Sequence, residues 1–151
     1  MAVFKFKLKA IHRLKSQIEE QEKNKFSLAV AALNAEIAIL NRIKGAIAAA
    51  VDEFRKLSGR RFTAGKIKDF NYFIAAMKES EAAQTKVVED AMRVVEEARK
   101  ALIIASQQRE MYDRLREKAF ILHMDGERRS EQRSVDELVS YRGNSQSGQY
   151  A

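Results

Sequence analysis

The fold is decided by FSLAVAALNAEIAILNRIKGAIAAAVDEF, residues 26–54, in which large apolar side chains recur in alternating steps of four and three residues. Of the nine positions on this line only Lys44 is charged, and the other eight are Phe26, Val30, Leu33, Ile37, Leu40, Ile47, Val51 and Phe54. That spacing is typical of the seam of a coiled coil. The stretch therefore predicts a long helix that packs along a second helix.

A second line with the same spacing runs from Ile67 to Ala105, and ten of its twelve positions are apolar. Beyond it the apolar side chains move to a shifted line, which predicts a change of register through Ile104, Met111, Leu115 and Leu122. Between the two seams lies LSGRRFTAGK, residues 57–66. Its Gly59 and Gly65 can adopt positive φ, and its Ser58 and Thr63 are turn or cap residues, so it predicts the connection between the helices.

Two long helices joined by a short loop are antiparallel neighbours. The expected fold class is therefore all-α, a long antiparallel two-helix coiled coil that forms one domain over 1–142. We expect its first helix over about 5–57, the turn over about 58–65, the second helix over about 66–140, and a disordered tail over 143–151.

This hairpin also fixes a register, because the residue numbers of facing positions should sum to about 123. Lys44 would then face Glu81, and we expect these two seam charges to pair. Residues after about 119 would overhang the start of the first helix. The overhang begins with AFILHM, residues 119–124, which carries no charge. It is either packed against the N-terminal arm or held by a larger partner.

The net charge of +7 is concentrated in two places. The segment 55–68 contains six basic and no acidic residues, and the N-terminal arm likewise lacks acids while it carries Lys5, Lys7, Lys9, Arg13 and Lys15. Such clusters favour an acidic protein partner, nucleic acid or an anionic membrane surface, and solvated helix faces are the alternative. The alternation of Phe4, Phe6 and Leu8 with lysines has the period of a strand. Because a lone strand is unstable, we interpret this arm as the frayed or helical tip of the first helix, with Phe4 and Leu8 on the seam.

The sequence offers no recognisable chemistry. It has no cysteine, no HExxH or C-x-x-C motif, and no glycine-rich phosphate-binding loop. Neighbouring carboxylates such as Glu19 and Glu20 do not face each other on a helix. We therefore expect no catalytic residue, no cofactor, no metal site and no enzyme activity. The absence of an apolar run of ~18 residues and of cysteine predicts a soluble, cytoplasmic protein without a membrane span.

Several stretches, read in order, resemble the flagellar FliJ family of small coiled-coil proteins in the type III export apparatus. They are FKFKLKAIHRLK at 4–15, FNYFIAAM at 70–77, VEEARKAL at 95–102, REMYDRLREK at 109–118 and EQRSVDEL at 131–138. The last stretch resembles the family's arginine-rich helix that ends in Asp-Glu-Leu. The resemblance covers nearly the whole chain.

The resemblance implies a stalk similar to the gamma subunit of rotary ATP synthases. Such a stalk would insert its paired termini into the hexameric flagellar export ATPase, promote assembly and activity of the ring, and escort empty export chaperones. It would also contact the cytoplasmic domain of the export-gate membrane protein, at the inner face of the membrane. On this basis the gate contacts are Phe73 and Met77, although Met77 also lies on the seam. The expected ring contacts are Lys5, Lys7, Lys9, Arg13, Phe120, Ile121 and Leu122.

Two alternatives stay open at this stage. The same architecture serves the stalk of a virulence-type secretion injectisome, although the Asp-Glu-Leu ending favours the flagellar version. A basic coiled-coil adaptor for nucleic acid or membranes is the alternative from a different class, although no nucleic-acid motif is recognisable.

Overall fold

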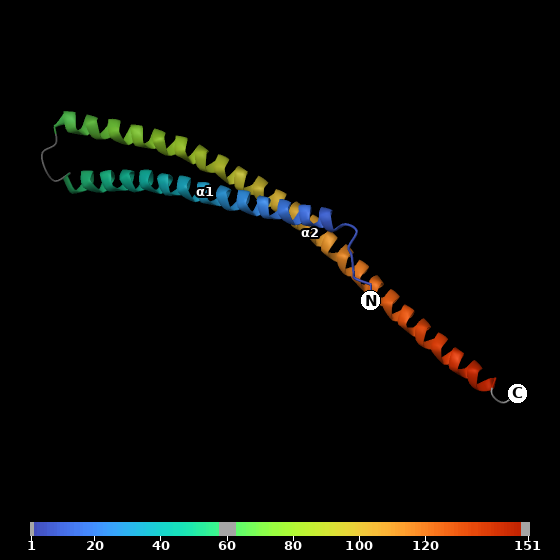
Figure 1. Ribbon diagram of the computed structural model, residues 1–151. Coiled ribbons are helices and arrows are strands. Elements are labelled where there is room, and N and C mark those ends of the chain that lie inside the picture. The colour runs from blue at the N-terminus through green and yellow to red at the C-terminus, as the bar shows by residue number, and fades with distance from the viewer. Residues whose placement is uncertain (1, 58–62, 149–151) are drawn as a thin grey trace. The chain divides into compact units, whose positions relative to one another are not determined.

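A computed structural model describes residues 2–57 and 63–148 of the chain. Within these ranges the chain forms two α-helices, α1 (Lys9–Leu57) and α2 (Ala64–Ser147), and no strand (Figure 1). The all-α hairpin predicted from the sequence is confirmed. The contacts divide the chain into two compact units. The hairpin unit is Glu20–Ile104, and the terminal unit combines Met1–Glu19 with Ala105–Ala151.

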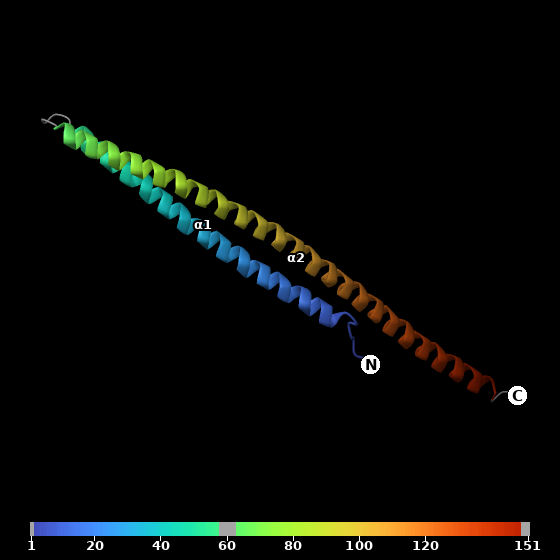
Figure 2. The ribbon, with the colours of Figure 1, turned by 90° about the horizontal axis from the view of Figure 1, so that it is seen from above.

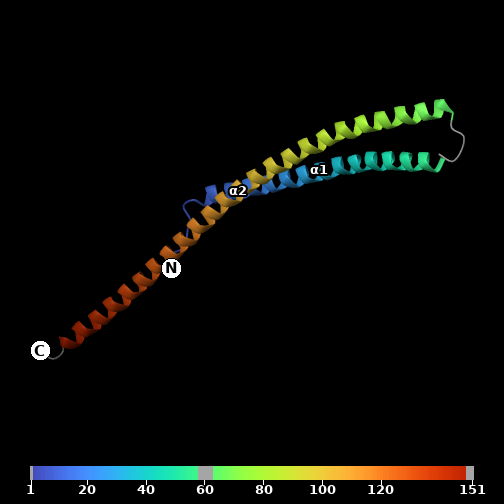
Figure 3. The same cartoon turned by 180° about the vertical axis from the view of Figure 1, so that it is seen from behind.

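In the hairpin unit, α1 and α2 run antiparallel and side by side (Figure 3). Leu40 and Val88 are buried between them, and all the apolar positions of the predicted line from Phe26 to Phe54 are buried or half-buried. The rings of Phe54 and Phe70 stack with their centroids 4.1 Å apart. These two residue numbers sum to 124, so the predicted register is correct at this contact.

Lys44 is the exception on the first seam, because its side chain is exposed. Among the ion pairs of the described hairpin residues, none joins it to Glu81, so the predicted pairing is wrong. Between Leu40 and Ile47, the half-buried side chain on the packed side of α1 is Ile43 rather than Lys44. An isoleucine contact leaves the lysine ammonium in water, which avoids the cost of desolvating a charge.

Thr63 caps the start of α2. The backbone N–H of Lys66 donates to the carbonyl oxygen of Thr63 at 3.1 Å and to its Oγ1 at 3.4 Å, as expected of an N-cap. The predicted turn over about 58–65 lies largely outside the described residues, and so do Ser58 and Gly59. Gly65 lies inside α2, and no glycine of the described ranges has a positive φ, so its predicted role in the turn is wrong.

In the terminal unit, α1 begins at Lys9 rather than near residue 5. Residues 2–8 form no helix, and a turn closed by the N–H of Lys9 on the carbonyl of Phe6 leads into α1. The first helical turn contains no acidic side chain. A helix extended through Lys5 and Lys7 would place more cations at the positive end of the helix dipole, which opposes its extension. The prediction that Phe4 and Leu8 lie on a helical seam is therefore wrong, because both residues precede α1.

The predicted change of register in α2 is wrong. The side of α2 that packs on α1 continues from buried Ala105 through four half-buried residues, which are Gln108, Arg109, Tyr112 and Asp113. The apolar residues of the shifted line in this unit, Met111, Leu115 and Leu122, are exposed. Ile104, at the end of the hairpin unit, is exposed as well. A continuous α-helix keeps its 3.6-residue period, so the packed side stays on one line even where its residues turn polar.

After Glu127 the described part of α2 is exposed at every residue, as expected of an overhang beyond the start of α1 (Figure 2). The helix continues to Ser147, whereas the sequence predicted its end near 140 and disorder from 143. No proline interrupts it, and Gly143 costs a helix only about 1 kcal/mol. The Ser145 hydroxyl donates to the carbonyl of Arg142 at 2.9 Å within this last stretch.

One property of α1 differs from the sequence expectation. It contains an 18-residue window with a mean hydropathy of 1.4, so by length and composition it could cross a membrane. The sequence contains no continuous apolar run of ~18 residues, whereas this window is apolar only on average. Core helices of soluble proteins can satisfy the same criterion.

Candidate partner-binding sites

The N-terminal arm folds onto α2 through aromatic contacts. Phe4 meets Phe120 edge to face, with ring centroids 5.3 Å apart, and lies 5.5 Å from the ring of His123. Nε2 of His123 lies 3.2 Å from the carbonyl oxygen of Ala2. The structure thus brings together the basic arm and Phe120, the first of the three apolar residues that the sequence assigned to the ring contact. Of the two readings of AFILHM, packing on the arm holds for Phe120.

Ile121 and Leu122 remain outside this cluster. Both side chains are exposed, and Leu122 retains 71% of its accessible surface. Phe120 is also 47% exposed, but part of its ring is in contact with Phe4.

The basic residues of the arm surround a hollow of about 550 Å³ beside the start of α1. Its lining is formed by Phe4, Lys5, Phe6, Lys9, His12, Arg13 and Arg116. No carboxylate lines it. Lys5, Lys9 and Arg13 form no ion pair within the described residues, and neither does Arg116. The hollow therefore presents four cations without an ion pair, an arrangement that suits carboxylates or other anions, although Asp113 and Glu117 line the adjoining hollow beside Arg116.

Two residues of this cluster differ from the contacts expected from the sequence. Lys7 is exposed but does not line the hollow. Arg116 was missed, because its proximity to the arm depends on a contact between segments about 100 residues apart.

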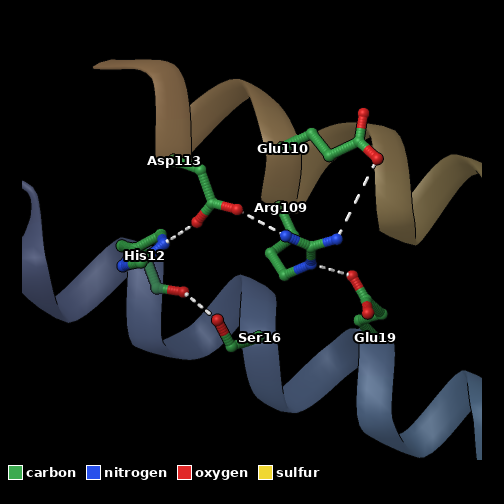
Figure 4. A network of polar contacts seen from close by, with 6 residues as sticks. All are labelled: His12, Ser16, Glu19, Arg109, Glu110 and Asp113. Atoms are coloured by element: carbon green, nitrogen blue, oxygen red, sulfur yellow. Dashed lines mark hydrogen bonds and ion pairs between the residues drawn. The ribbon is translucent and has the colours of Figure 1, made fainter. Parts of the chain in front are cut away.

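Behind the hollow, a polar network joins α1 to α2 (Figure 4). Nε2 of His12 lies 2.5 Å from Oδ1 of Asp113. The guanidinium of Arg109 donates to the carboxylates of both Asp113 and Glu19, and it lies 4.0 Å from that of Glu110. Glu19 is the buried member, with 5% of its surface exposed. Ionic contacts thus replace the apolar seam in this unit.

The network shifts the protonation of its members. The hydrogen bond with His12 is the main reason that the pKa of Asp113 is lowered, and the charge of Arg109 lowers it further. The hydrogen bond to Glu19 is the main reason that the pKa of Arg109 is raised. Asp113 is therefore held ionised. Lys15 adds a neighbouring link by donating to Oε1 of Gln108 at 3.0 Å.

This arrangement serves to hold two helices in register. In residues 2–57 and 63–148, no group of three or more His, Cys, Asp or Glu side chains is placed to hold a metal ion. Sequence reasoning missed the network. The available signal was the run of polar residues on the line that continues the second seam beyond Ala105.

The predicted gate residues lie in the hairpin unit and differ in availability. Phe73 keeps 47% of its surface exposed and lines a hollow of about 600 Å³ together with Phe54 and Phe70. Ala46, Ala49 and Ala50 widen this hollow, since their side chains are short. Met77 is half-buried on the line that faces α1. Phe73 is thus accessible to a partner, whereas Met77 contributes to the core.

The family model of the flagellar FliJ protein matches residues 4–148. The chain belongs to the FliJ family. This membership confirms the resemblance seen in the sequence and makes the chain a component of flagellar protein export. No curated protein and no solved structure matches the chain significantly.

The FliJ match includes all the candidate contact residues from Lys5 to Leu122. It extends over both the terminal unit and the hairpin unit, so the two candidate sites belong to parts of the chain that the family shares.

Proposed function

We propose that this FliJ-family chain is the non-enzymatic central stalk of the flagellar export ATPase and that its terminal unit enters the hexameric ring. The observation that carries the proposal is the hollow of unpaired cations at Lys5, Lys9, Arg13 and Arg116. A ring opening lined by acidic or polar groups would attract such a cluster.

Apolar contacts accompany these charges in the proposed ring site. Ile121 and Leu122 are exposed on α2, and Phe4 and Phe120 hold the arm beside them. Charged groups would guide entry, and the exposed apolar side chains would give the bound state its lifetime. Lys7, which is exposed next to the hollow, is included among the proposed ring contacts.

The second proposed contact is with the cytoplasmic domain of the export-gate membrane protein. Phe73 is its main residue because it is accessible in an apolar hollow, and Met77 supports it from the core. The chain would act in the cytoplasm at the inner face of the membrane and would escort empty export chaperones there. The flagellar family match favours this assembly over a virulence-type injectisome.

The test of ring entry is the ATP hydrolysis rate of the purified cognate export ATPase with and without the chain. We compare a variant carrying Lys5→Glu, Lys9→Glu and Arg13→Glu with a control carrying Lys78→Glu, Lys86→Glu and Lys100→Glu. The control changes the net charge equally at exposed sites of the hairpin unit. Circular dichroism checks that both variants remain helical.

We expect the wild type and the control to stimulate hydrolysis and the arm variant to lose most of the stimulation. Equal stimulation by both variants would refute the role of the arm while keeping the stalk. If the wild type neither stimulates nor co-migrates with the ATPase, the stalk proposal fails. Nucleic-acid binding that falls steeply with added salt would then favour the adaptor alternative.

Gate binding is tested separately with the purified cytoplasmic domain of the gate protein. Phe73→Ala should weaken capture of that domain by about tenfold or more, as expected of an anchor residue. Tyr72→Ala is the matched control, because Tyr72 is a neighbouring exposed aromatic residue that does not line the same hollow. Equal loss in both variants would contradict the assignment to Phe73.

A further inference from the structure

An apolar line on α2 of the terminal unit has no partner in the described chain. It consists of Met111, Leu115 and Leu122, and Met111 keeps 51% of its surface exposed. These residues lie roughly a quarter of a turn around the helix from Ala105 and Tyr112, which face α1. The line is therefore a separate face of α2 rather than the edge of the packed side.

This face is hollowed at its centre. Met111 and Leu115 form the apolar part of a hollow of about 420 Å³. Its remaining lining is polar and is formed by Gln107, Glu110, Arg114 and Lys118. An apolar centre with a charged rim is the usual composition of a protein–protein contact.

We propose that a second copy of this chain packs on this face, α2 against α2 in antiparallel orientation, with a two-fold axis beside Asp113. Met111 and Leu115 lie two residues before and two residues after Asp113. A two-fold axis there places Met111 of each copy opposite Leu115 of the other. Such mixed pairs are the layers that two antiparallel helices form, and a two-fold axis closes the assembly as a dimer.

The charges on the rim select the same orientation. Glu110 precedes the centre of the hollow, whereas Arg114 and Lys118 follow it. An antiparallel copy brings Glu110 of one chain to the basic end of the other, and a parallel copy would set like charges side by side. Arg114 and Lys118 form no ion pair within the described residues. Among residues 2–57 and 63–148, the ion-pair contact of Glu110 is the one with Arg109, at 4.0 Å.

The central contacts of this dimer, Met111 and Leu115, lie about a quarter of a turn from the side of α2 that faces α1 and do not line the basic hollow of the arm. Leu122 alone is shared with the proposed ring contact. The dimer is a self-association of the free chain. Leu122 extends the apolar face at each end of the proposed contact, since it lies on the same line.

Sedimentation equilibrium of the full chain tests the dimer over concentrations from about 1 μM to about 1 mM, where an interface of this small size should associate. We expect a reversible monomer–dimer equilibrium. Leu115→Asp should raise the dissociation constant by about tenfold or more, because it removes an apolar anchor from both copies. The matched control is Leu138→Asp, since Leu138 is 63% exposed on the opposite side of α2.

A chain that stays monomeric at every concentration tested by sedimentation would overturn the inference. An equal effect of the two leucine substitutions overturns the assignment to this face. Circular dichroism verifies that each variant stays helical, and an exposed position makes unfolding by the substitution unexpected.

The orientation is tested by reversing charges. Glu110→Arg and Arg114→Glu should each weaken the dimer, because each sets like charges opposite one another across the axis. The double variant should restore association to near the wild-type level. A double variant as weak as the single variants would contradict the antiparallel contact.

Cross-linking gives an independent test, since the chain contains no cysteine. With the axis beside Asp113, cysteines placed at Arg114 lie about 3 Å apart along the helix direction, whereas those placed at Gln132 lie about 57 Å apart. Both positions point in the same direction around α2. A short bis-maleimide should therefore link Arg114→Cys chains and leave Gln132→Cys chains unlinked. Linking of both variants would indicate a parallel dimer and overturn the proposal.

Discussion

The most direct test of the hairpin packing is Leu40→Ala. Leu40 is 8% exposed and lies at the centre of the first seam. The substitution removes about three carbon groups, and at about 0.8 kcal/mol each the lost burial amounts to about 2.4 kcal/mol. The contribution of a residual cavity should be small, because two helices can close on the gap more readily than a many-sided core. We therefore expect a loss of about 2–3 kcal/mol in the free energy of unfolding.

The assay is urea unfolding followed by circular dichroism at the helical band. The control is Leu28→Ala, the same chemical change at an exposed position of α1, which should alter the free energy of unfolding by less than about 0.5 kcal/mol. Similar losses for the two variants would refute the reasoning, because they would mean that the line through Leu40 is not the packed side. A change of slope without a change of midpoint would instead indicate a less compact unfolded or folded chain.

Three further predictions concern the terminal unit and the start of α2. Because the pKa of Asp113 is lowered in the folded chain, its contribution to stability is complete above pH ~4 and is lost as the pH falls through the folded pKa. The difference in unfolding free energy between wild type and Asp113→Asn should be about 0.5–1 kcal/mol at neutral pH, since the ion pair is partly exposed. Urea titrations at decreasing pH should show this difference becoming smaller. Phe4→Ala should release the N-terminal arm from Phe120, so trypsin should cleave at Lys5 at least about tenfold faster in limited digestion. An unchanged cleavage rate would show that the contact between the two phenylalanine side chains does not hold the arm. Thr63→Ala should lower the free energy of unfolding by about 1 kcal/mol because it removes the cap of α2, whereas Thr63→Asp should preserve it. Urea unfolding measures both variants, and equal losses would exclude capping by the side chain.

The sequence predicted the hairpin because its signals are local. The spacing from Phe26 to Phe54 defines a helix face within one segment, and a short connection then leaves the second helix only one antiparallel arrangement. The stack of Phe54 on Phe70 agrees with this arrangement. The family assignment was also available, because it rests on short stretches whose order along the chain is preserved.

The terminal unit was less predictable because its contacts are polar and distant in sequence. Periodicity shows that Met111, Leu115 and Leu122 share a face but does not show what that face meets, so they were assigned to the seam. The true packed side carries Arg109 and Asp113, which become favourable only when Glu19 and His12 lie opposite them. The position of Arg116 beside the arm was unpredictable for the same reason, because it depends on a contact between segments distant in sequence.

The polar network of the terminal unit has a consequence for how the chain opens. Ionic contacts weaken with added salt and with acid, whereas the apolar contacts around Leu40 and Val88 do not. Amide hydrogens in α1 near His12 should therefore exchange with solvent increasingly fast as the ionic strength rises, while those near Leu40 keep their protection. The start of α1 can then separate from α2 reversibly and as an independent step, while the helices remain packed around Leu40 and Val88.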